Sequence, residues 1–96
     1  MTNYNNAAYL QKMQKDLMKK MEEFGEKEFD YDYMNGSVVV KITGNLKILS
    51  LNINETLIDP TDKITLQEMI AEAINEAIEA VNNARQDLMP SIPGLF

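Results

Sequence analysis

The sequence predicts an α+β fold in which one helix precedes a three-stranded antiparallel meander and a second helix follows it. Residues 36–53 (GSVVVKITGNLKILSLNI) contain two segments in which apolar residues alternate with others, the pattern of half-buried strands. Asn35-Gly36 and Gly44-Asn45 are hairpin signals, because both residue types tolerate the positive φ angles of tight turns. The segments on either side of this stretch have helical periodicity.

The first helix is predicted from five apolar residues that recur at steps of three and four: Leu10, Met13, Leu17, Met21 and Phe24. We expect residues 1–8, which are polar and rich in Asn, to be frayed or only partly helical. Gly25 is the expected C-cap of the helix. Methionine fills gaps in ordinary cores and is also common on adaptable binding surfaces, so we assign Met13, Leu17 and Met21 to core or subunit packing.

Lysines lie on the opposite side of this helix. Lys12, Lys15 and Lys19 share one ridge at 100° per residue, and Lys20 flanks it. One interpretation is a solvated face that keeps a Met-rich helix soluble. The other is a patch that contacts phosphate groups.

The two turns also predict how the strands pair. A two-residue turn at Asn35-Gly36 places aromatic and β-branched residues opposite each other on one face: Tyr33 with Val38, Tyr31 with Val40, and Phe29 with Ile42. A two-residue turn at Gly44-Asn45 pairs Thr43 with Leu46, and it continues that face with Leu49 opposite Val40 and Leu51 opposite Val38. Three apolar residues remain for the other face: Val39, Leu46 and Ile48. Since a chain of this size has a small core, we expect this second surface to serve in self-association.

Residues 54–63 (NETLIDPTDK) are a predicted loop, with Leu57 and Ile58 packed against the core. Thr65 and Glu68 have the spacing of a capping box, which predicts that the second helix starts there. Pro90 ends this helix.

One side of the second helix is apolar and is expected to be buried. Its residues are Leu66, Ile70, Ala73, Ala77, Val81, Ala84 and Leu88, with Met69, Ile74 and Ile78 beside them. Glu68, Glu72, Glu76 and Glu79 share the far side, where glutamates are typical of a solubilising face rather than a cation site.

Composition limits the function classes. The chain of 96 residues has room for one domain, residues 1–96, with 1–8 and 89–96 as expected flexible tails. It has no Cys and no His, which excludes disulfides, thiol nucleophiles and histidine-based catalysis or zinc sites. No secretory pattern or membrane span is evident, so the expected setting is the cytoplasm. We expect no cofactor, no metal and no enzymatic activity, and the net charge of −6 restricts any nucleic-acid site to a local patch.

The order of elements, together with particular residues, resembles the YbaB/EbfC family of small bacterial nucleoid-associated DNA-binding proteins. The first helix (LQKMQKDLMKKMEEF) is similar to the family's Gln-, Met- and Lys-rich helix, and Gly36 and Gly44 bound a strand as the family's glycines do. The segment LQEMIAEAINEA and the ending PGLF are similar to the family's second long helix and its proline-glycine tail.

The resemblance implies a tweezer-like homodimer in which the sheets pack centrally and helices project as paired arms that hold duplex DNA. Carried onto this chain, it implies a role in nucleoid organisation and gene regulation, with phosphate contacts from Lys12, Lys15, Lys19 and Lys20 and a weaker candidate in Arg85. The alternative is an acidic dimeric adaptor that binds another protein through the Met-rich helix and the apolar tail.

Overall fold

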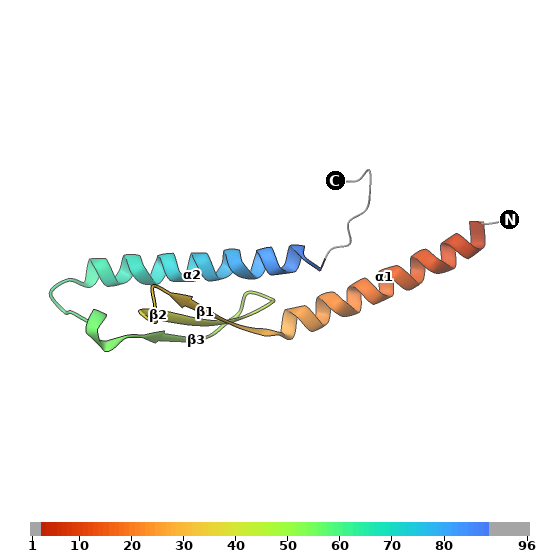
Figure 1. Cartoon of the computed structure of the whole chain (residues 1–96). Coiled ribbons are helices and arrows are strands. Elements are labelled where there is room, and N and C mark those ends of the chain that lie inside the picture. The colour runs from red at the N-terminus through yellow and green to blue at the C-terminus, as the bar shows by residue number, and fades with distance from the viewer. Residues whose placement is uncertain (1–2, 89–96) are drawn as a thin grey trace.

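The computed structural model describes residues 3–88 and has the predicted α+β order (Figure 1). Its elements are α1 (Asn3–Glu26), β1 (Glu28–Tyr33), β2 (Val38–Thr43), β3 (Ile48–Ile53), a short 3-10 helix η1 (Glu55–Leu57) and α2 (Lys63–Gln86). The strands form one antiparallel sheet in the order β1-β2-β3. Figure 1 shows α2 lying along the sheet while α1 projects away from it.

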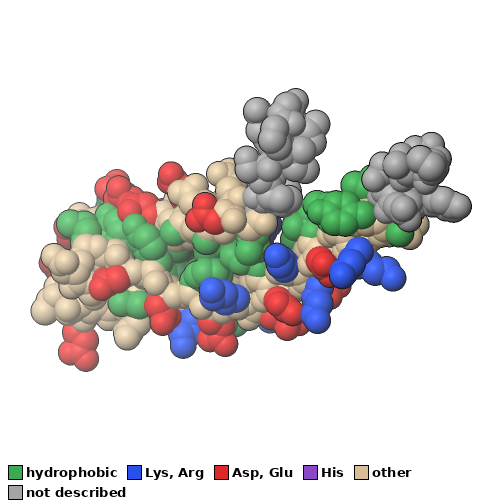
Figure 2. Space-filling model, turned by 45° about the vertical axis from the view of Figure 1, so that its right-hand side comes forward, with side chains coloured by type: hydrophobic (Ala, Val, Ile, Leu, Met, Phe, Trp, Pro, Cys, Tyr) green, Lys and Arg blue, Asp and Glu red, His purple; other side chains and the backbone are tan. Residues whose placement is uncertain are grey.

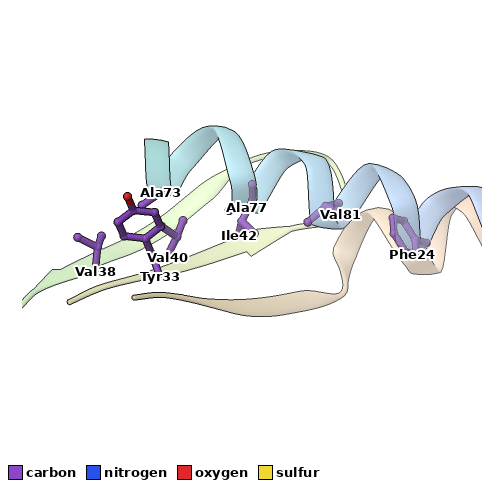
Figure 3. Close-up of a cluster of buried hydrophobic side chains, with 8 residues drawn as sticks. All are labelled: Phe24, Tyr33, Val38, Val40, Ile42, Ala73, Ala77 and Val81. Carbon is purple, nitrogen blue, oxygen red and sulfur yellow. The ribbon is translucent and has the colours of Figure 1, made fainter. Parts of the chain in front are cut away.

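The core lies between α2 and the first two strands. Figure 3 shows Ala73, Ala77 and Val81 of α2 in a row above the sheet, with Phe24 from the end of α1 at one end of that row. The other buried side chains are Tyr33, Val38, Val40 and Ile42. Alanine at two of the helix positions lets the backbone of α2 approach the strands closely. The predicted buried side of the second helix is therefore confirmed.

The first hairpin has the predicted pairing. Tyr33 lies opposite Val38, and the register continues along both strands to Phe29 and Ile42. Asn35 and Gly36 have φ angles of 55° and 85°, as a type I′ turn requires.

The predicted register of the second hairpin is wrong by two residues. Leu51 lies opposite Val40 rather than Val38, and Ile53 takes the position opposite Val38. The turn is longer than two residues, because the amide of Thr43 donates to the carbonyl of Lys47 at 2.9 Å and Leu46 takes a φ of 65°. A shift of two keeps the same residues on the same face.

The predicted position of Ile48 is also wrong, because β3 contains a bulge. The pairing changes between Lys41 and Ile42, so that Ile48 lies opposite Ile42 and Leu49 is the extra residue. Residues directly opposite each other share a face. Ile48 therefore lies on the side of the sheet that carries α2, rather than on the opposite face, and β3 is left uncovered with Ile48 40% exposed.

The start and end of α1 differ from prediction. The helix begins at Asn3 rather than after residue 8, and it continues past Gly25 to Glu26. Gly25 is helical and its φ is not positive, so it is not a C-cap. A Cβ at this position would lie 2.6 Å from Oδ1 of Asn45, at the end of an exposed side chain of the β2–β3 turn.

The loop before α2 also differs in two details. The helix starts at Lys63 with Asp62 as its N-cap, whose carboxylate accepts from the amide of Thr65 at 3.3 Å. Aspartate is among the strongest N-cap residues, so the helix begins earlier than the predicted capping box at Thr65. Leu57 packs against the core as predicted, whereas Ile58 is 57% exposed.

Candidate nucleic-acid interface

Helix α1, which we call the arm, stands apart from the rest of the described chain. Its 24 residues span about 36 Å at 1.5 Å per residue. Of the side chains between Ala7 and Glu23, only that of Leu17 is even half-buried. The radius of gyration is 19.6 Å, whereas a compact chain of this length has about 12–13 Å. The arm therefore offers most of its surface to a partner.

The arm brings together the four lysines that the sequence analysis selected. Lys12, Lys15, Lys19 and Lys20 are all exposed, and Figure 2 shows basic side chains gathered along the arm. Across the part of the chain that the structure describes, the only ion pair within 4.0 Å joins Lys41 to Glu28, so none of these lysines forms an ion pair at that distance. The three that share the ridge extend over about 10 Å of helix.

Charge is separated along the molecule. Residues 3–20 contain four lysines and one acidic residue, Asp16, although the net charge of the chain is −6. Figure 2 shows acidic side chains over the sheet and α2. The same ridge turns acidic at the base of the arm, at Glu22, Glu23 and Glu26, so a polyanion meets attraction only along residues 3–20 and repulsion at the base of the arm and the rest of this surface.

Arg85 is not part of the lysine ridge. Its guanidinium donates to the carbonyl of Gly44 and lies 5.6 Å from the ring centroid of Phe24, and the side chain is half-buried. We therefore do not include Arg85 in the proposed phosphate contacts. The sequence carried no signal for this contact, because its partners come from three elements far apart in the chain.

The residues predicted for dimer or core packing fall into two groups. Met13, Leu17 and Met21 lie on the arm, and the two methionines are 36% and 42% exposed. The other group lies on or beside the sheet, where Leu46 and Ile48 are exposed and Val39 is half-buried. The second group does not form one surface, because Val39 and Ile48 lie on opposite faces of the sheet.

Two tyrosines of β1 form hydrogen bonds to glutamates of α2, although the helical periodicity predicts a solvated face for these glutamates. The hydroxyl of Tyr33 donates to Glu72 at 2.6 Å and that of Tyr31 donates to Glu76 at 2.7 Å. The hydrogen bond to Glu72 and burial raise the pKa of Tyr33 to about 12, and the bond to Glu76 raises the pKa of Tyr31. The residue spacing could have predicted these two pairs. The tyrosines are two residues apart on a strand, which is about 7 Å, and the glutamates are one helical turn apart, which is about 5–6 Å.

Other classes of site find no support in residues 3–88. No group of three or more acidic side chains there is arranged to hold a metal ion. Neither of the long helices in that range has the length and apolar content of a membrane span. The tail residues 89–96, which the adaptor alternative uses, lie outside the described residues.

Comparisons with known proteins agree on one family. The model of the YbaB/EbfC DNA-binding family matches residues 1–95. A nucleoid-associated protein of Ureaplasma parvum serovar 3 is 47% identical over 94 residues and covers 94% of each chain. A nucleoid-associated protein of Ureaplasma urealyticum serovar 10 is 47% identical over 85 residues, or 88% of this chain and 85% of that protein.

A crystal structure of an uncharacterised protein from Helicobacter pylori has the same fold. The two chains superpose with a TM-score of 0.70 over 92% of each, at 24% identity. The family matched by sequence is one of DNA-binding proteins and not of enzymes, which confirms the expectation that this chain is not an enzyme. From the match along nearly its whole length, the chain belongs to the YbaB/EbfC DNA-binding family.

Proposed function

We propose that this protein binds duplex DNA largely without sequence preference, as a homodimer, and acts at the nucleoid in its organisation and in gene regulation. The observation that carries the proposal is the arm itself, where four exposed lysines are gathered in a chain that is otherwise strongly acidic. The family match and the nucleoid-associated relatives support the same function.

The lysine ridge suits phosphate groups rather than bases. Each lysine offers a charge-assisted hydrogen bond to a phosphate oxygen, which fixes position on the duplex without reading sequence. Lys12, Lys15 and Lys19 follow one line on the helix, so they can contact phosphates simultaneously. Binding through such contacts weakens steeply as salt rises, because counterions are released from the DNA.

A second copy accounts for the apolar surface left open. In the described part of the chain the core contains only eight buried hydrophobic residues, and small cores often gain stability by association. The strip of β3 next to the core includes Ile48 and Leu51, which are 40% and 37% exposed. We assign this strip, together with Met13 and Met21 on the arm, to the contact between copies.

The test is binding of the purified protein to a labelled random duplex across a salt series. Replacing Lys12→Glu together with Lys19→Glu should reduce affinity at low salt by about 100-fold or more, since two phosphate contacts become two repulsions. The matched control is Lys47→Glu with Lys63→Glu, which makes the same change in net charge at exposed lysines outside the arm.

The control separates a local site from an effect of total charge. An equal loss of DNA affinity in both double variants would contradict a site on the arm. Absence of binding by the unaltered protein at low salt would contradict DNA binding altogether. The exposed Met13, Met18 and Met21 favour the adaptor alternative in that case. Its test is then the search for a protein that binds the arm and is released when these methionines are replaced.

A further inference from the structure

The base of the arm closely contacts the β2–β3 turn and α2 at one place, which we call the joint. The joint consists of Phe24 and Gly25 at the end of α1, Gly44 and Asn45 in the β2–β3 turn, and Arg85 near the end of α2. The amide of Asn45 donates to the carbonyl of Gly25 at 3.1 Å, and the amide of Gly44 donates to the carbonyl of Lys27 at 3.0 Å. Two backbone hydrogen bonds therefore join the turn to the base of the arm.

The joint is closely packed. Both glycines are buried, and a Cβ at Gly44 would collide with the carbonyl of Phe24. A Cβ at Gly25 would meet the side chain of Asn45. The turn and the arm therefore approach each other at backbone distance, where a small change in either alters the direction of the helix.

Arg85 connects this contact to α2. Its Cζ lies over the ring of Phe24, at 5.6 Å from the centroid, while Nη2 donates to the carbonyl of Gly44. A planar guanidinium can stack on an aromatic ring and donate a hydrogen bond at the same time, which an ammonium group does poorly. The same side chain thus contacts the arm and the turn and anchors both to α2.

The joint controls the direction of the arm because the arm has few other contacts with the described chain, where Leu88 lies beside Leu17 and Met21. Between Ala7 and Glu23 the arm's side chains are exposed, apart from the half-buried Leu17. Lys12 lies about 18 Å from Phe24 along the helix, so a rotation of about 20° at the joint moves this lysine by about 6 Å. Phosphates on one strand follow each other every 3.4 Å or so of duplex axis, and a displacement of this size therefore breaks the register of the lysine contacts.

From these contacts we propose that Arg85 is a positioning residue for DNA binding: it sets the direction of the lysine-bearing arm and does not itself contact DNA. This inference rests on the proposed function. It assigns to Arg85 a role distinct from that of the lysines on the arm, and it makes DNA affinity depend on the angle between the arm and the sheet.

The experiment measures arm direction and DNA affinity in the same variants. Because the chain has no cysteine, spin labels at Tyr9→Cys and Glu79→Cys report the distance between arm and α2 by pulsed electron resonance. Dilution with an excess of unlabelled protein restricts the signal to pairs within one protomer. The variants are Arg85→Ala and Arg85→Lys, and Lys63→Ala is the control, since it removes the other basic residue of α2 at an exposed site.

Arg85→Ala should broaden the distance distribution and weaken DNA binding by about tenfold at low salt. Arg85→Lys keeps the charge but should recover only part of the narrow distance distribution and of the DNA affinity. Lys63→Ala should leave the distance distribution and the affinity near those of the unaltered protein. Phe24→Leu keeps an apolar side chain but removes the ring, and it should broaden the distances like Arg85→Ala. Circular dichroism identifies variants that remain folded, and Phe24→Leu provides the test if Arg85→Ala does not fold.

A phosphate contact by Arg85 predicts a different result. In that case Arg85→Ala would lower the salt slope by about one with unchanged distances, and Arg85→Lys would keep the affinity. That outcome, or unchanged distances in both Arg85→Ala and Phe24→Leu, overturns the inference. If the unaltered protein does not bind the duplex at low salt, the proposed function fails, while the distance measurement still decides whether Arg85 holds the arm.

Discussion

At the scale of single residues, the pair formed by Tyr33 and Glu72 links β1 to α2 by chemistry that depends on pH. The tyrosine ring is buried in the core and its hydroxyl reaches the carboxylate at the edge of the helix. The bond requires the protonated phenol, and this raises the pKa of Tyr33 to about 12. Tyr31 repeats the arrangement one helical turn further along, with Glu76.

The raised pKa predicts a loss of stability in alkali. The folded-state pKa of Tyr33 lies above its unfolded value near 10, so the contribution is complete below about pH 10 and is lost as the pH rises through about 12. In Tyr33→Phe this contribution is absent, and the difference in stability from the unaltered protein should therefore shrink between pH 9 and 12.

Urea unfolding followed by circular dichroism measures this difference at each pH. Tyr9→Phe is the matched control, because Tyr9 is 63% exposed on the arm. A stability difference between Tyr33→Phe and the unaltered protein that stays constant from pH 9 to pH 12 would contradict the predicted role of the hydroxyl.

At the scale of elements, local pattern predicted the helices, the strands and the first hairpin, while contacts between elements decided the remaining details. Asn35-Gly36 set the first register because its own turn chemistry is sufficient. The register at Gly44-Asn45 could not be predicted, because the base of the arm packs on that turn and a bulge follows at Leu49. The lysine ridge followed from helical spacing alone, whereas the contacts of Arg85 depend on tertiary structure.

The start of α2 gives a prediction at this scale. Asp62 accepts from the amide of Thr65 and also from its hydroxyl, at 2.8 Å, so it satisfies a helix donor that has no partner within the helix. Asp62→Ala should cost about 1 kcal/mol, a fall in melting temperature of about 4–8 °C. Asp62→Asn keeps the acceptor and should lose much less. Thermal melts of both variants test this prediction. Equal falls in melting temperature would show that the charge of Asp62, rather than its capping hydrogen bond, stabilises the helix.

At the scale of the whole molecule, the number of arms on one duplex determines how affinity responds to salt. Each copy carries four lysines on its arm. If a dimer places both arms on one duplex, the slope of log affinity against log salt should be about −7, whereas one arm gives about −4.

Disrupting the dimer should change the slope and the mass together. Ile48→Thr with Leu51→Thr removes apolar surface from the exposed strip while keeping strand propensity, and it adds no charge. We expect the mass in solution to fall from twice 10.9 kDa to a single chain, with the slope near −4. Ile58→Thr is the control, since Ile58 is 57% exposed outside the sheet. A single-chain mass for the unaltered protein at micromolar concentration would contradict the homodimer.

The separation of charge between residues 3–20 of the arm and the acidic remainder of the chain also makes the protein an electric dipole along its 74 Å length. On the proposed binding mode, the field of the duplex exerts a torque on this dipole within the Debye length, about 10 Å at 0.1 M salt. The protein is therefore turned arm first before contact, and encounters through the acidic surface are rejected. The net negative charge therefore favours collisions in which the lysines face the duplex, so a minority of basic residues is enough for binding.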